Sequence, residues 1–215
     1  MIKAVIFDMN GVIVDNESFH ESIIRQLLSE KNIAVSHEDF KRIFYGRTDE
    51  NGFKSLVHEY KLSDNPLELI KEKRRREQGK INDSFTEVQG SRDLIKRLST
   101  NFTLAIVSSA IRSEVNSVLK KFGLDKYFKI IVSGDDVVYG KPNPEPYLLA
   151  STKLNIAPEK CIVIEDAENG IISAITAGMK AIALRSSYSL STDFKQANAI
   201  VDNLMQTTPK YIHAL

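Results

Sequence analysis

The chain has 215 residues, of which 42% are hydrophobic, so it can bury a substantial core in one domain with an insertion or in two small domains. Its 29 lysines and arginines nearly balance its 28 aspartates and glutamates, so the overall charge favours neither nucleic acid nor a membrane surface as a partner. No apolar run approaches the roughly 20 residues that span a bilayer, and the first residues do not form a signal peptide, which predicts a cytoplasmic protein.

Five short apolar runs rich in β-branched residues predict buried strands. In chain order they are KAVIFD (3–8), FTLAIVSS (102–109), KIIVS (129–133), CIVIED (161–166) and KAIAL (180–184), and a weaker signal follows in AIVDNL (199–204). The one cysteine, Cys161, lies inside the fourth run, which predicts a buried, inert thiol. Helical segments alternate with the runs from residue 90 onward, so we predict an α/β fold with a parallel sheet and helices on both of its faces.

The segment between Asp15 and Gln89 has a different pattern. Apolar residues recur there at helical spacing, and no run predicts a strand; the repeating positions include Phe19, Ile23, Ile24, Leu27 and Leu28. We therefore expect a helical cap at residues 16–89, inserted into a core made of residues 1–15 and 90–215.

Polar residues follow the predicted strands at the edge where a parallel α/β sheet binds its ligands. They are Asp8, Asn10 and Gly11 after the first strand, Ser108 and Ser109 after the second, Glu165 and Asp166 after the fourth, and Lys141 in the loop YGKPNPEPY. Each of these alone is more typical of a turn or a solvated side chain. Their repetition at successive strand ends is what indicates a shared site.

Three carboxylates at one edge require a cation among them, and Mg²⁺ prefers such oxygen ligands together with a substrate phosphate. Ser108 and Ser109 offer hydroxyl and backbone N–H groups to an anion near a helix start, and Lys141 adds a positive charge. A carboxylate nucleophile, a metal ion, hydroxyls and a lysine together predict phosphoryl transfer.

Four motifs resemble those of the haloacid dehalogenase superfamily: DMNGVIVD, VSS, GKPNPEPY and IEDAENGI. The resemblance covers residues 3 to about 184. It implies a Rossmann-like core with a small helical cap and an Asp8 that becomes phosphorylated. It also implies Mg²⁺ held by Asp8, the carbonyl of Asn10 and Asp166, with Glu165 adjoining, and a phosphoryl group gripped by Ser108 and Lys141.

Within that superfamily the chain looks most like the β-phosphoglucomutase-like branch, which includes sugar-phosphate phosphatases. His20 stands five residues after Asp15, as in the mutases, and YGRTDENG corresponds to the specificity loop of the branch. Mutases follow the loop glycine with x-Ser-Arg, whereas this chain has Gly46-Arg47-Thr48, so its arginine comes too early for mutase specificity. Arg47 is either a substrate contact or a solvated loop residue, and His20 either a site residue or a hinge residue.

The basic run KEKRRREQGK (71–80) predicts a mainly solvated cap helix that turns one residue, Lys73 or Arg76, toward the substrate. It has no interleaved aromatic residues, and the chain is not basic overall, so nucleic-acid binding is not expected.

Residue 10 departs from the family pattern, because the resemblance implies an acid there that gives and takes the proton of the leaving or attacking oxygen. Asn10 can hydrogen-bond and ligate a metal through its backbone carbonyl, but it cannot shuttle a proton. Three explanations remain open: an engineered substitution that traps a bound state, a natural enzyme with slow chemistry, or a non-catalytic protein that binds a phosphorylated metabolite.

We therefore predict a monomeric, Mg²⁺-dependent phosphatase of small phosphorylated metabolites, sugar phosphates in particular, acting through a phosphorylated Asp8. The alternatives are a β-phosphoglucomutase-type phosphomutase and a phosphometabolite-binding protein.

Overall fold

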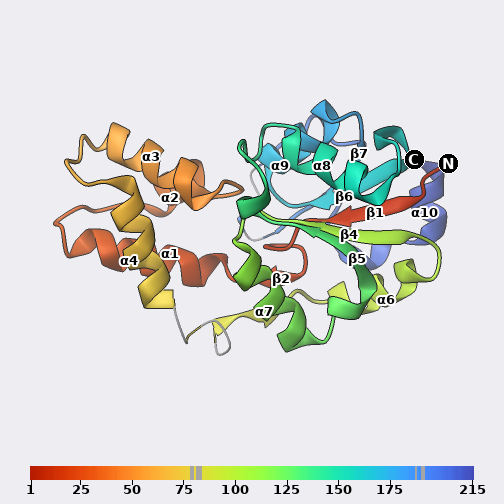
Figure 1. The fold of residues 1–215 in the computed structure, drawn as a ribbon, viewed down its shortest axis with the longest axis horizontal. Helices are drawn as coiled ribbons and strands as arrows, with labels where there is room; N and C mark the ends of the chain where they lie inside the picture. The colour runs from red at the N-terminus through yellow and green to blue at the C-terminus, as the bar shows by residue number, and fades with distance from the viewer. Residues whose placement is uncertain (78–79, 81–83, 187, 190–191) are drawn as a thin grey trace.

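The computed structural model describes residues 1–77, 80, 84–186, 188–189 and 192–215 of the chain. In this part of the chain the main sheet has six strands in the order β5-β4-β1-β6-β7-β8, and each neighbouring pair is parallel (Figure 1). The strands are β1 (Ala4–Phe7), β4 (Thr103–Val107), β5 (Phe128–Val132), β6 (Cys161–Glu165), β7 (Lys180–Leu184) and β8 (Ala199–Val201). The predicted parallel α/β sheet is confirmed, and all six apolar runs contribute a strand to it.

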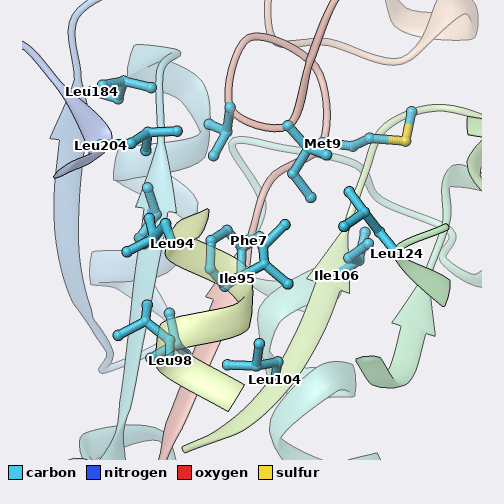
Figure 2. Close-up of a cluster of buried hydrophobic side chains, with 14 of the residues drawn as sticks. Phe7, Met9, Leu94, Ile95, Leu98, Leu104, Ile106, Leu124, Leu184 and Leu204 are labelled. Atoms are coloured by element: carbon cyan, nitrogen blue, oxygen red, sulfur yellow. The ribbon is translucent and has the colours of Figure 1, made fainter. Parts of the chain in front are cut away.

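The central strands are buried on both faces, as their unbroken apolar runs predict. Alternate residues of β1 enter separate cores, with Val5 and Phe7 on one face and Ala4 and Ile6 on the other. Figure 2 shows the first core, where Phe7 lies among leucines and isoleucines of the surrounding elements. Burial on both faces fixes the register of β1, and hence where its carboxyl end places Asp8.

Helices cover both faces of the sheet (Figure 1). On one face lie α6 (Ser91–Ser99), α7 (Arg112–Phe122) and α10 (Pro209–Ala214); on the other lie α8 (Glu145–Leu154) and α9 (Glu168–Thr176). Short 3₁₀ turns at Asp125–Tyr127, Gly134–Asp136, Pro158–Lys160 and Leu204–Gln206 complete this part of the chain. None of the helices described is both long and apolar enough to cross a membrane.

A separate group of helices lies beside the carboxyl ends of the central strands (Figure 1). It consists of α1 (Glu17–Ser29), α2 (His37–Phe44), α3 (Asp49–Glu59) and α4 (Pro66–Glu77). These helices have their own buried core, which includes Leu28, Phe40 and Phe53 and to which Tyr188 adds a side chain from the segment after β7. The expected helical cap is confirmed as a structural feature, while its limits at residues 16 and 89 stay a prediction.

Two strands that the sequence analysis did not predict join the cap to the core. β2 (Val14–Asp15) pairs antiparallel with β3 (Thr86–Glu87), so the expectation of no strand between Asp15 and Gln89 is wrong. The reason is physical: a two-residue strand has no periodicity, and β3 forms because the folded chain brings it beside β2. The ladder holds together the two chain segments that lead into and out of the cap.

Candidate active site

The carboxyl ends of β1 and β6 bring three acidic side chains together. Asp8, Glu165 and Asp166 are all buried, and each offers an oxygen within 4.8 Å of the others. The sequence analysis predicted this cluster from the strand ends alone. Because β1 and β6 are parallel neighbours, with Phe7 paired to Ile164, their carboxyl ends must meet at one edge.

Lys141 is the buried cation of this cluster. Its Nζ lies 2.6 Å from Asp8 Oδ1 and also donates to Glu165 Oε1. Burial lowers the pKa of Lys141, but the charges of Asp8 and Glu165 outweigh burial and raise the pKa well above its ordinary value. Lys141 is therefore a fixed positive charge beside the expected nucleophile.

Glu165 is held by partners from the protein itself. Its Oε2 accepts hydrogen bonds from the backbone N–H groups of Asp166 and Ala167, both at 2.9 Å. Its Oε1 accepts from the Tyr147 hydroxyl at 3.3 Å as well as from Lys141. This geometry suits a residue that orients Lys141, and the role of Glu165 as a metal ligand stays a prediction.

Asp166 faces the cavity and lies against the loop after β1. A Cβ placed on Gly11, whose φ is +73°, would come 1.7 Å from Asp166 Oδ2, so only glycine allows this approach. Burial, followed by the charges of Glu165 and Asp8, raises the pKa of Asp166 well above its ordinary value. The carboxylate is thus costly to ionise without a cation nearby.

The charge balance of the cluster suits a divalent cation. Burial raises the pKa of Asp8 to about 7, although Lys141 opposes this shift. When all three buried carboxyl groups are ionised, one ammonium leaves an excess of negative charge, and Mg²⁺ takes oxygen ligands of this kind. The residues present therefore fit the metal that the family resemblance implies, with Asp8 and Asp166 as the carboxylates that line the cavity.

Asn10 lies in the same cavity with a buried side-chain oxygen. Its Oδ1 has no hydrogen-bond partner among the described residues. An unpartnered buried amide oxygen is costly unless a ligand supplies a donor. The orphaned atom indicates that something polar binds here, and it does not restore a proton shuttle.

The two serines after β4 lie where the sequence predicts an anion site. Ser108 is buried, and its Oγ accepts a hydrogen bond from the backbone N–H of Ala110 at 3.1 Å. Ser109 is half-buried and packs its carbonyl oxygen against Gly134. Both serines line the cavity together with Asp8 and Lys141.

This cavity has a volume of about 1140 Å³ and lies between the core and the cap. It is lined by every predicted site residue except Glu165. The core supplies Asp8, Asn10, Ser108, Ser109, Lys141 and Asp166, and the cap supplies His20, Gly46, Arg47, Thr48 and Lys73. The structure thus brings the two predicted groups to one space, which sequence spacing alone could not show for the cap residues.

His20 is bound on three sides. Its Nδ1 lies 2.7 Å from Glu77 Oε1, and its Nε2 lies 3.6 Å from Glu114 Oε1 and 2.9 Å from the side-chain amide of Asn16, which can turn its oxygen toward an imidazolium. Burial, and then the charge of Lys73, lower the pKa of His20, but the nearby Glu114 carboxylate and the hydrogen bond to Glu77 outweigh them and raise it to about 10. His20 is therefore an imidazolium near neutral pH, connecting α1 to α4 within the cap and to α7 of the core.

The basic run contributes more residues to the cavity than the one that the sequence analysis expected, because Lys71, Lys73, Arg74 and Arg75 all line it. Residues 78 and 79 lie outside the described residues. Lys73 is 4% exposed and lies 3.0 Å from Asp49 and 2.9 Å from Glu77. Arg76 pairs instead with Glu30 and Glu72 and does not line the cavity. Of the two candidates in this run, Lys73 is the one that reaches the site.

Four residues of the site were missed from the sequence: Glu17, Tyr45, Glu77 and Glu114. All four line the cavity. The hydroxyl of Tyr45 donates to Asp166 Oδ2 at 2.5 Å. Glu17 and Glu114 lie in no quoted motif, and Tyr45 and Glu77 lie in the loop YGRTDENG and in the basic run without being singled out there, so only the tertiary contacts could identify their roles.

Comparisons with known proteins agree with this geometry. The family model of haloacid dehalogenase-like hydrolases matches residues 5–184. The chain is 33% identical over 183 residues to a phosphorylated carbohydrates phosphatase of Thermotoga maritima, covering 84% of each protein. It is 28% identical to the fructose-1-phosphate phosphatase YqaB of Escherichia coli, over 84% of this chain and 95% of that protein.

A solved structure of β-phosphoglucomutase from Clostridium difficile has the same fold, with a TM-score of 0.85 and 25% identity over 100% of this chain and 96% of that one. The matched residues include all the strand ends that form the site. The chain therefore belongs to the haloacid dehalogenase-like hydrolases, in the branch of β-phosphoglucomutase-like proteins and sugar-phosphate phosphatases.

Proposed function

We propose that this chain is a Mg²⁺-dependent phosphatase of small phosphorylated metabolites, with sugar phosphates as substrates and a phosphorylated Asp8 as intermediate. One observation carries the proposal: a buried Asp8 carboxylate lies 2.6 Å from Lys141 and beside Asp166, at a cavity shared by core and cap. The names of the two phosphatase relatives support the substrate class.

The reaction has two displacements at phosphorus. In the first, a carboxylate oxygen of Asp8 forms a bond to phosphorus while the bond to the sugar oxygen breaks, and that oxygen takes up a proton. In the second, water forms a bond to phosphorus and loses a proton, the bond to Asp8 breaks, and inorganic phosphate leaves. Positioning and charge neutralisation supply most of the catalysis in such transfers.

The core residues then have distinct tasks. Lys141 orients Asp8 and neutralises charge on the phosphoryl group, and Glu165 holds Lys141 in place. Ser108 and Ser109 bind phosphoryl oxygens. Asp8, the Asn10 carbonyl and Asp166 would hold Mg²⁺, which supplies further positive charge for the phosphoryl oxygens when it is bound.

The cap residues, on this proposal, select the substrate. We assign the cap to residues 16–89 and the core to residues 1–15 and 90–215. Arg47 supports a substrate-binding role for the cap, because it lines the cavity and its Nε is buried without a hydrogen-bond partner among the described residues. Gly46 places the loop against the core, where a Cβ would come 2.5 Å from that of Ala167. His20, Thr48 and Lys73 complete the substrate side of the cavity.

Asn10 makes the proton steps slow on this proposal. A general acid or base typically contributes about 10²- to 10⁴-fold to a rate. An amide of similar size preserves the shape of the site but transfers no proton. We therefore expect binding of metal and substrate with turnover reduced by about that factor.

The test is a comparison of this chain with its Asn10→Asp variant. Each is incubated with Mg²⁺ and a panel of sugar monophosphates, and inorganic phosphate is measured. The variant should release phosphate about 10²- to 10⁴-fold faster. Adding Asp8→Asn to the variant should abolish that release, because the nucleophile is lost.

The alternatives give different products in the same assay. Isomerised sugar phosphate without net phosphate release would support a phosphomutase instead. No turnover by either protein, with metal bound and Asp8 accessible, would support a phosphometabolite-binding protein and contradict the phosphatase.

A further inference from the structure

Tyr45 is a cap residue whose hydroxyl group forms a hydrogen bond with the carboxylate of Asp166 in the core. It follows α2 directly, and its hydroxyl lies 2.5 Å from Asp166 Oδ2, 3.0 Å from the Asp166 carbonyl oxygen and 3.0 Å from Ser186 Oγ. Asp166 and Ser186 follow Tyr45 by 121 and 141 positions in the chain. The contacts of Tyr45 give the cap a direct polar contact with an acid of the candidate metal site.

Several features hold the Tyr45 ring in this place. It stacks on the ring of Tyr188, with centroids 5.8 Å apart and planes inclined by 28°. The Tyr188 hydroxyl in turn donates to Glu21 Oε2 of α1 at 3.0 Å. Gly46, with φ of +67°, then turns the chain so closely against Ala167 that a Cβ would not fit. The position of the hydroxyl is therefore fixed by packing on both sides.

The Tyr45 hydroxyl has one proton, which it donates to the Asp166 carboxylate, while its oxygen can accept from the Ser186 hydroxyl. In proteins, carboxylates that ligate metals are themselves oriented by hydrogen bonds from neighbouring groups. A donor on Oδ2 restricts rotation of the Asp166 carboxyl group and fixes the direction of its remaining lone pairs.

We propose that Tyr45 is a positioning residue for Asp166, so that contact of the cap with the core orients this carboxylate for Mg²⁺. The inference rests on the proposed function, because it takes Asp166 as a metal ligand. Since coupling between two equilibria is reciprocal, Mg²⁺ bound at Asp166 also favours this contact between Tyr45 of the cap and the core.

The direct test is Mg²⁺ binding to the Tyr45→Phe variant without substrate, measured by titration calorimetry. Phenylalanine keeps the ring stacked on Tyr188 and removes only the hydroxyl. Loss of a group that orients a metal ligand typically weakens metal affinity about 10- to 100-fold. We expect at least a tenfold higher dissociation constant for Mg²⁺ than in the unmodified chain.

Tyr188→Phe is the matched control, because it removes one hydroxyl from the other ring of the same stack. That hydroxyl contacts Glu21 and not Asp166. Its loss should leave the dissociation constant for Mg²⁺ within twofold. Melting temperatures of both variants without metal show whether each is folded at the titration temperature.

A second measurement uses phosphate release in the Asn10→Asp background. Adding Tyr45→Phe should raise the half-saturating Mg²⁺ concentration at least tenfold, while the rate at saturating Mg²⁺ stays within threefold. A rate that falls equally at every Mg²⁺ concentration would contradict a metal-positioning role.

The outcomes separate this inference from the proposed function. Mg²⁺ binding by the unmodified chain with equal affinity in Tyr45→Phe overturns the inference alone. Equal weakening in Tyr45→Phe and Tyr188→Phe also overturns it, since packing of the cap would then be the cause. Absence of Mg²⁺ binding by the unmodified chain overturns the proposed function and the inference together.

Discussion

At the scale of single residues, a glycine allows the backbone of the loop after β1 to approach the Asp166 carboxylate closely. Gly11 and Gly123 both have left-handed backbones, with φ of +73° and +62°, but their surroundings differ. A Cβ on Gly11 would collide with Asp166, whereas a Cβ on Gly123 would have no atom within 4 Å. Substitutions at the two positions therefore share the cost of a side chain in a left-handed backbone, and only a substitution at Gly11 also disturbs the site.

Gly11→Ala should therefore abolish Mg²⁺ binding, while Gly123→Ala should not. Both substitutions force a side chain into the left-handed region, which costs about 1–2 kcal/mol of unfolding free energy. Only Gly11→Ala also displaces the Asp166 carboxylate. Urea unfolding and Mg²⁺ titration of both variants check this, and normal Mg²⁺ affinity in Gly11→Ala would contradict the assigned role of Asp166.

At the scale of elements, charged side chains connect the cap helices to one another and to the core. His20 of α1 contacts Glu77 of α4 and Glu114 of α7, and Lys73 of α4 contacts Asp49 of α3. These groups are largely buried, so removing one partner leaves an uncompensated charge. Such a network stabilises the arrangement of the helices only over a defined range of pH.

The stability that His20 contributes should fall with rising pH. Its pKa is about 10 in the folded protein, against an ordinary value of 6.5, because the Glu114 and Glu77 carboxylates that face the ring outweigh burial and the charge of Lys73. A raised folded-state pKa gives stability that is fully present below pH 6.5 and is lost as the pH rises to about 10. The difference in unfolding free energy between the unmodified chain and His20→Gln should therefore shrink across this window.

Urea unfolding at pH 6, 8 and 10 measures that difference. Glu77→Gln supplies the partner experiment, because removing the carboxylate should lower the pKa of His20, as followed by nuclear magnetic resonance. A His20 ring that titrates near pH 6.5 in the unmodified chain would contradict the interpretation.

At the scale of the whole molecule, the cavity exists because the cap rests against the core at a few close contacts. One of them joins the specificity loop to the segment before Lys141. A Cβ on Gly140 would come 2.7 Å from Thr48 Cγ2, closer than packing allows. The backbone of Gly140 is not left-handed, so an alanine there acts through this contact alone.

Gly140→Ala should hinder cap closure, and Thr48→Ser should relieve the effect. Overpacking typically costs about 1–3 kcal/mol, which corresponds to roughly 5- to 150-fold in kcat/KM for a reaction that needs the cap against the core. Serine removes Cγ2 and keeps the hydroxyl that caps α3 by accepting from the Asn51 N–H. In the Asn10→Asp background, adding Thr48→Ser to Gly140→Ala should restore most of the lost kcat/KM. If kcat/KM is not restored, contact between residue 140 and Thr48 is not the cause of the loss.

The sequence by itself determined the parallel sheet and the acidic edge. Buried parallel strands are unbroken apolar runs, so their ends could be located to within one or two residues, and Asp8, Ser108, Glu165 and Asp166 followed from those ends. The placement of Lys141 beside Asp8 matched the expectation drawn from its motif.

Only the tertiary structure decided how the cap meets this edge. Glu114 lies in no motif, and the segments around Tyr45 and Glu77 do not show which groups these residues contact. Strand β3 is too short to show periodicity. Local patterns record which face of an element is buried, because burial selects residue type at regular spacing. They do not record which polar groups meet across long stretches of the chain, such as the 57 positions between His20 and Glu77 or the 121 between Tyr45 and Asp166, since those contacts depend on how separate elements pack.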